Sequence, residues 1–254
     1  MLYLCIKYTA LAEKYIETSF IYLTRLSYLY IKYTALAERY TETSFIYLAR
    51  LSYLCMQNKI TMQREYLEQQ LLAAEAFAQP ILKKYYAEGT QAYEIIITHS
   101  RQVARKTMNV LLQHPELKVD VAFVLEAAYL HDIGVFLCDA PAIECYGTHR
   151  YIEHGYLGAD LLRKEGLTRH ALVAERHTGV GITKSQIEQE NLPLPRDRHY
   201  EADSLEEKIV SYADKFYSKT HLDEEVINKK IVKKLMQHGE DAVKRFEEWN
   251  EMFG

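Results

Sequence analysis

Histidine and aspartate side chains that can bind metal ions recur along the chain between residues 99 and 214. Imidazole and carboxylate together suit first-row divalent ions such as Mn, Fe, Co, Ni and Zn, and this mixture does not select one of them. The sequence therefore predicts a metal centre with one or two divalent ions, which can be transition-metal ions or Mg²⁺. The predicted ligands are His99, His131, Asp132, His154, His177 and Asp214.

The pair His131-Asp132 follows the run 121–130, which is apolar on nearly every face. A helix of this kind is normally buried, so the two polar residues close a buried helix. An ionised carboxylate without a partner costs several kcal/mol in such a place, which favours a cation beside Asp132. We expect Gly134 to end this helix in the left-handed conformation.

His99 and Asp214 lie on the apolar stripes of two other expected helices. His99 comes four residues after Ile95, and Asp214 comes four residues after Val210. Residues four apart share one face of a helix, so both side chains are expected to face the interior.

His154 and His177 decide between one metal ion and two, since both can face inward from amphipathic stretches. His170 would share the face of His177, but two helical turns separate them by about 10.5 Å, so one of this pair is not a ligand. We favour His177, because Gly179 ends the helix beside it, and we expect His170 at the surface. His149 is the weaker rival of His154, since it stands in a turn.

The ordered pattern of His99, the His131-Asp132 pair and Asp214 resembles the H…HD…D signature of the HD superfamily of metal-dependent phosphohydrolases, over residues 80–220. The resemblance implies hydrolysis of a phosphoester or phosphoanhydride, with Asp132 bridging the metals. The chain departs from the frequent form HDIGK, because Val135 follows HDIG. A lysine contact to phosphate at that position is therefore not expected.

The dipeptide His154-Gly155 and the tripeptide His177-Thr178-Gly179 extend this resemblance. They are similar to the pattern of bacterial HD enzymes that split diadenosine tetraphosphate symmetrically. A second ion held by the two histidines is implied. A phosphorylated nucleotide, with a dinucleoside polyphosphate as the best single guess, is the expected substrate. The alternative is a non-catalytic HD domain that binds metal or nucleotide for regulation.

Basic residues near the predicted ligands are candidates for binding substrate phosphates. Lys215 and Arg101 are assigned to catalysis beside Asp132, and Arg176 to substrate binding. The long stretch 180–203 also carries Arg196, Arg198 and His199, and a loop of this length is often functional. It is expected to be a lid over the metal site or, alternatively, a solvated connector.

Composition limits the class of protein and its partners. The chain has 254 residues, 48% of them hydrophobic, and a formal net charge of −4. A basic excess is the usual mark of a nucleic-acid surface, so DNA is not an expected partner. The four cysteines show no CxxC spacing, and no uncharged run near the N-terminus reaches the ~20 residues of a membrane helix. We expect a cytoplasmic protein without disulfides, for which homo-oligomer formation is open.

Residues 6–30 and 31–55 form a tandem repeat that differs at four of 25 positions, Lys14/Arg39, Ile16/Thr41, Thr24/Ala49 and Tyr30/Cys55. Stable repeat arrays need about three units, so two near-copies indicate a recent duplication. We interpret residues 1–55 as an extension that is not part of the fold, with Met56 or Met62 as the usual start. The alternative is an amphipathic pair of helices that mediates association or touches a membrane surface.

The helical periodicity of residues 62–254 predicts an all-α HD domain with a C-terminal helix. The run from Asp223 is rich in Lys and Glu and is expected to be a solvated amphipathic helix. The expected helices span 62–88, 91–113, 119–132, 151–165, 168–178, 204–219 and 223–252.

Overall fold

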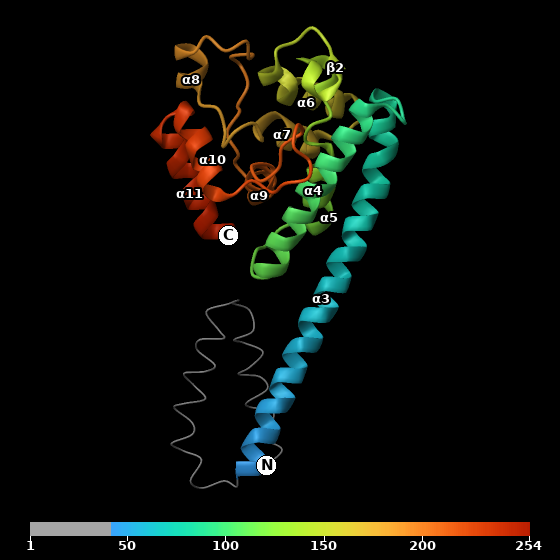
Figure 1. Ribbon diagram of the computed structural model, residues 1–254, viewed down its shortest axis with the longest axis vertical. Helices are drawn as coiled ribbons and strands as arrows, with labels where there is room; N and C mark the ends of the chain where they lie inside the picture. The colour runs from blue at the N-terminus through green and yellow to red at the C-terminus, as the bar shows by residue number, and fades with distance from the viewer. Residues whose placement is uncertain (1–41) are drawn as a thin grey trace. The chain divides into compact units, whose positions relative to one another are not determined.

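The computed structural model describes residues 42–254 and confirms an all-α fold. Its helices are α3 (Glu42–Tyr85), α4 (Gln91–Gln113), α5 (Val121–Leu130), α6 (His154–Lys164), α7 (Thr168–Arg176), α8 (Lys184–Gln189), α9 (Leu205–Asp214), α10 (Asn228–Leu235) and α11 (Glu240–Phe253) (Figure 1). Short 3-10 turns are η2 (Val135–Leu137), η3 (Pro141–Ile143), η4 (Tyr151–Glu153) and η5 (Met236–His238). Most of the tandem repeat lies outside the described residues, and its last residues, 42–55, belong to α3.

The chain divides into two compact units. In its described part, the first consists of residues 42–68 of α3 and the segment 111–118. Apolar side chains of α3 in this unit are exposed, among them Tyr47 and Met62. The second unit consists of residues 69–110 and 119–254 and contains all six predicted metal ligands. The candidate site therefore lies within this second unit.

Helix α7 lies at the centre of the second unit, where it packs against α5, α6 and α9. Helix α5 is capped at its N-terminus by Asp120, whose side chain accepts a hydrogen bond from the Phe123 amide at 3.2 Å. This cap satisfies an amide that the first turn of a helix leaves without a partner. Seven of the ten residues of α5 are buried, as its apolar sequence predicts. The HD pair therefore emerges from the middle of the core.

The C-terminal run is not one solvated helix, which corrects the sequence prediction. Gly239, at φ +99°, separates α10 from α11. The aromatic residues Phe246, Trp249 and Phe253 recur at helical spacing on α11 and are buried. Phe246 and Phe253 contact Tyr212 of α9, with ring centroids 5.8 and 5.5 Å apart. Helix α11 thus completes the core behind α9, which carries Asp214 at its end.

The stretch 180–203 is more ordered than a plain loop. It contains α8 and a small apolar cluster of Ile187, Leu194 and Tyr200. Thr183 caps α8 by accepting a hydrogen bond from the Gln186 amide at 3.2 Å.

A two-stranded hairpin, β1 (Asp139–Ala140) and β2 (Cys145–Tyr146), is the sheet of the described chain. In the same part, no helix has both the length and the apolar character needed to cross a membrane.

Candidate metal centre

The turn after α5 that carries His131, Asp132 and Gly134, called the HD turn below, is fixed by close backbone packing against α6. Gly134 has φ −82°, so it does not adopt the left-handed conformation that the sequence suggested. A Cβ atom at this position would lie 2.3 Å from the carbonyl oxygen of His154 and 2.4 Å from the amide nitrogen of Gly158. The glycine is therefore required by the close approach of α6, and this approach brings His154 beside Asp132.

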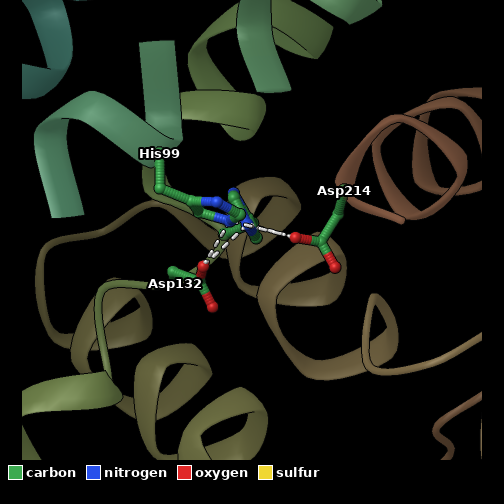
Figure 2. A group of neighbouring side chains, drawn as sticks. His99, Asp132 and Asp214 are labelled. Carbon is green, nitrogen blue, oxygen red and sulfur yellow. Dashed lines mark hydrogen bonds and ion pairs between the residues drawn. The ribbon is translucent and has the colours of Figure 1, made fainter. Parts of the chain in front are cut away.

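The first group of candidate ligands is His99, His131, Asp132 and Asp214. Oδ2 of Asp132 lies 3.1 Å from Nε2 of His99 and 2.9 Å from Nε2 of His131. Oδ1 of Asp214 lies 3.0 Å from the same nitrogen of His99. Figure 2 shows His99 reaching between the two carboxylates. Residues from α4, the HD turn and α9 thus meet at one point.

The second group is formed by the other oxygen of Asp132. Oδ1 lies 3.3 Å from Nε2 of His154 and 3.5 Å from Nε2 of His177. The two oxygens of one carboxylate therefore point to two separate sets of imidazole nitrogens. One carboxylate is therefore shared between the two groups.

The orientation of three histidines fits metal binding. In each, Nδ1 lies within hydrogen-bond distance of the carbonyl oxygen three residues earlier: 2.7 Å for His131, 2.6 Å for His154 and 2.8 Å for His177. A neutral imidazole that donates from Nδ1 keeps its lone pair on Nε2, the usual state of a metal-bound histidine. The backbone thus aims the Nε2 atoms of all three rings at Asp132.

Two further observations show that a cation suits this site. Nε2 of His154 and Nε2 of His177 face each other at 3.0 Å. Two nitrogens that both carry lone pairs repel at this distance unless a proton or a metal ion lies between them. Nε2 of His131 and both carboxylate oxygens of Asp132 are also fully buried without a well-formed hydrogen bond. The residues present therefore fit one or two divalent ions.

The electrostatics of the cluster keep both aspartates ionised. Burial opposes the charge of Asp132, but the charges of His131 and Lys219 outweigh it and hold its pKa well below the usual range. Burial is likewise overcome at Asp214, where Lys215 lowers the pKa of the carboxyl group. Burial also opposes protonation of His131, yet the Asp132 carboxylate raises its pKa to about 9.

The histidines of the second group differ in charge from His131. Burial and the neighbouring His177 lower the pKa of His154 to about 3. Burial also lowers the pKa of His177. Both imidazoles are therefore neutral near pH 7, which is the form that binds metal ions.

Lys219 is a functional candidate that the sequence prediction missed. Its Nζ lies 2.6 Å from Oδ2 of Asp132, and its side chain is only 11% exposed. It comes five residues after Asp214, in the turn that follows α9, where helical periodicity no longer applies. The signal that could have found it is the surplus of negative charge in a buried cluster, which calls for a nearby cation. Lys215, which was predicted, pairs with Oδ2 of Asp214 at 2.8 Å.

The arginines assigned from sequence lie elsewhere. Arg101 is half exposed and pairs with Glu75 at 2.6 Å. Arg176 pairs with Asp203 and Glu207, and Arg198 with Asp160 and Glu175. Arg196 is exposed. None of the four lines the cavity beside the cluster, so the structure does not bring them to the ligands.

The competing histidines also find structural partners. His170 is buried, which corrects the expected surface position, and its Nε2 lies 3.0 Å from Glu126. Its ring lies against Phe77 and Phe123, with centroids 5.7 and 5.0 Å away. His149 lies 3.2 Å from Glu153. Neither belongs to the two ligand groups.

A cavity of about 700 Å³ opens beside the cluster. The ligands His154, His177 and Asp214 line it, together with Lys215 and Lys219. Its remaining wall combines basic residues with apolar ones: Arg150, Lys230, Lys234, Ile143, Ile152, Ile182, Leu192, Ile231 and Leu235. A volume of this size is typical of small-molecule sites. The candidate metal centre is therefore accessible to a ligand.

Comparison with known proteins places the cluster within a family domain. Residues 96–218 match the HD domain model, and all six candidate ligands lie in this span. The chain thus contains an HD domain, an all-α metal-binding fold. No solved structure matches the chain.

Curated relatives match about half of the chain. An uncharacterized protein of Methanocaldococcus jannaschii is 39% identical over 124 residues, which are 48% of this chain and 65% of that protein. A tRNA (cytidine(56)-2'-O)-methyltransferase of Picrophilus torridus is 31% identical over 132 residues, 52% of this chain and 34% of that protein. The corresponding enzyme of Thermoplasma volcanium is 30% identical over 141 residues, 55% of this chain and 36% of that protein. The chain thus spans only part of each relative's length.

Proposed function

We propose that this HD domain is a metal-dependent phosphohydrolase that cleaves a phosphoester or phosphoanhydride bond of a nucleotide. One observation carries the proposal: the two oxygens of Asp132 face two separate sets of imidazole nitrogens. A carboxylate shared in this way suits paired ions, and paired ions are typical of enzymes that displace a group at phosphorus.

The chemistry divides between the ions and the chain. Divalent ions held by the two groups would polarise phosphoryl oxygens and supply a nucleophilic hydroxide at neutral pH. Asp132 and Asp214 hold negative charge at the centre of the cluster, and three histidines are kept in position by backbone carbonyls. The buried position of Asp132 excludes bulk water from the oxygens that face the ligands. Lys215, at the cavity wall, supplies positive charge for a phosphate group.

The composition of the cavity supports a nucleotide as substrate. A nucleotide combines a flat, largely apolar base with an anionic phosphate chain. The wall offers apolar side chains such as Ile152 and Ile182 beside the metal ligands, and the lysines Lys230 and Lys234 carry positive charge elsewhere on the wall. The volume of about 700 Å³ is large enough for more than a single phosphate.

Within this class we propose a dinucleoside polyphosphate. This choice rests on the resemblance of the segments around His154 and His177, and the basic residues on the cavity wall suit a long polyphosphate chain. We do not extend the methyltransferase activity of two relatives to this chain, because the match spans 34% and 36% of those proteins.

The test is a substrate screen on the purified chain with its metals quantified. Nucleoside phosphates, cyclic nucleotides and dinucleoside polyphosphates are each incubated with Mn, Fe, Co, Ni, Zn or Mg, and phosphate or nucleotide products are measured. Turnover of at least one nucleotide is expected, with loss of turnover in Asp132→Asn. If the protein with its metal sites filled hydrolyses none of these substrates, the result would favour the alternative of a non-catalytic regulatory HD domain.

A further inference from the structure

Lys219 stands out because it is a largely buried lysine that contacts a candidate metal ligand. Its Nζ lies 2.6 Å from Oδ2 of Asp132 and 5.8 Å from the ring centroid of Tyr151. The lysine also interacts with the hydroxyl group of Tyr151, which lines the same cavity. The turn that carries it is fastened by a hydrogen bond from Gln102 to the carbonyl oxygen of Leu222. The ammonium group is therefore held at the boundary between the cluster and the cavity.

Too many positive or donor groups converge on one oxygen of Asp132. His99 and His131 approach Oδ2 at 3.1 and 2.9 Å, and Lys219 approaches at 2.6 Å. A carboxylate oxygen has two lone pairs, so it cannot serve a metal ion, a histidine and an ammonium group equally well. An ion bound between the two histidines and Oδ2 would also repel the ammonium group. Metal binding and the contact with Lys219 thus compete.

An ammonium group that leaves Asp132 needs another anion. A buried charge without a partner costs several kcal/mol, and within residues 42–254 the ion pair of Lys219 is with Asp132. The lysine stem is flexible, so the head can turn into the cavity while its base stays fixed. The cavity is where a substrate would place its phosphate beside His154, His177 and Asp214.

We infer that Lys219, which lies between Asp132 and the cavity, is a substrate-binding residue whose ammonium group binds a phosphoryl oxygen of the substrate. The inference rests on the proposed function for the identity of the substrate. It adds a phosphate contact that comes from the turn after α9 rather than from the residue after HDIG, where Val135 is buried in the core.

The experiment measures the affinity of the manganese-loaded protein for inorganic phosphate by calorimetry, together with metal content. Lys219→Gln is compared with Lys229→Gln, an exposed lysine of α10 that does not line the cavity. We expect Lys219→Gln to keep the metal content of the wild type and to bind phosphate about tenfold more weakly or worse, which is about 1.4 kcal/mol. Lys219→Arg should keep most of the affinity, and Lys229→Gln all of it.

Other outcomes separate this inference from the proposed function. Unchanged phosphate affinity in Lys219→Gln, at equal metal content, overturns the inference even when nucleotides are hydrolysed. Weaker phosphate binding in a protein that hydrolyses no nucleotide leaves the inference standing and removes the proposed function. If the glutamine variant does not fold, Lys219→Met, which has similar length and no charge, takes its place with the same expected loss. Loss of metal from the folded variant would make Lys219 a structural partner and also overturn the inference.

Discussion

Gly134 of the HD turn and Gly158 of α6 pack backbone against backbone, since a Cβ atom on Gly134 would lie 2.4 Å from the amide nitrogen of Gly158. The same contact places His154 at the start of α6, where its Nε2 reaches Oδ1 of Asp132 at 3.3 Å. The HD turn and α6, which both carry candidate ligands, can therefore approach this closely because neither Gly134 nor Gly158 has a side chain.

Gly134→Ala should separate α6 from the HD turn. We expect a loss of roughly 1–3 kcal/mol in the free energy of unfolding, the usual cost of overpacking, together with a lower metal content. Gly89→Ala is the control, because its Cβ would meet open space and only the left-handed φ of +79° is strained. Thermal unfolding and elemental analysis give the two readouts. Equal losses in both variants would show that the contact does not position the ligands.

The metal content should distinguish the two ligand groups. We expect up to two transition-metal ions per chain in the wild type, and one fewer in the double variant His154→Ala with His177→Ala, because the first group keeps its four ligands. His149→Ala is the matched control, since this histidine pairs with Glu153 outside both groups. Elemental analysis after metal supplementation is the measurement. A content well below one ion per chain in the wild type would contradict the predicted centre.

Asp132→Ala and the isosteric Asp132→Asn should both abolish phosphate release. The loss is expected to be on the order of 10³-fold or more in kcat, because the shared ligand of both groups is removed. Circular dichroism should still show a helical protein. Asp139→Ala, an exposed aspartate of β1, is the control and should keep full activity. Activity that survives in either Asp132 variant would refute the assigned role.

Metal uptake should release protons from the first group. The pKa of His131 is about 9, so this imidazole is protonated at pH 7 and must lose its proton when an ion takes its place. We expect about one proton released per chain at pH 7, and progressively fewer as the pH rises through 9, where the histidine is already neutral. Calorimetry in two buffers of different ionisation enthalpy measures the number. His154, with a pKa of about 3, should contribute none.

A chain that starts at Met62 should keep its metal content and turnover. All six candidate ligands lie beyond this residue, and Leu67 is the first buried residue of α3 among those whose burial is described. We expect kcat/KM to change by less than about tenfold, or ~1.4 kcal/mol of transition-state stabilisation. Steady-state kinetics and thermal unfolding of both chains provide the check. A larger loss would mean that the first 61 residues support the active site.

The candidate ligands could be predicted from sequence because each interrupts an apolar helical stripe. His99 and Asp214 are polar at positions that periodicity assigns to the interior, and Asp132 closes an apolar run. The all-α class followed from the same periodicity. Burial of Phe246 and Trp249 on α11 was also readable from their spacing of three, but the surrounding Lys and Glu residues favoured a solvated helix.

Other features depend on contacts that one sequence does not display. Lys219 lies in a turn, where no period relates its position to that of Asp132 far earlier in the chain. The role of Gly134 comes from the approach of another backbone, whereas the sequence pointed to a left-handed helix end. Arg198 was assigned to substrate, yet Asp160 and Glu175 neutralise it, and such pairings become visible only in three dimensions.

The carbonyl contacts of His131, His154 and His177 have a consequence for how metal ions enter and leave. Because the backbone orients each ring without help from an ion, the ligands are preorganised by the fold. Small zinc domains, by contrast, are unfolded without their metal, since binding supplies their folding energy. In this protein a chelator should remove the ions while the helices stay folded. Bound ions should therefore exchange with those in solution without unfolding of the chain.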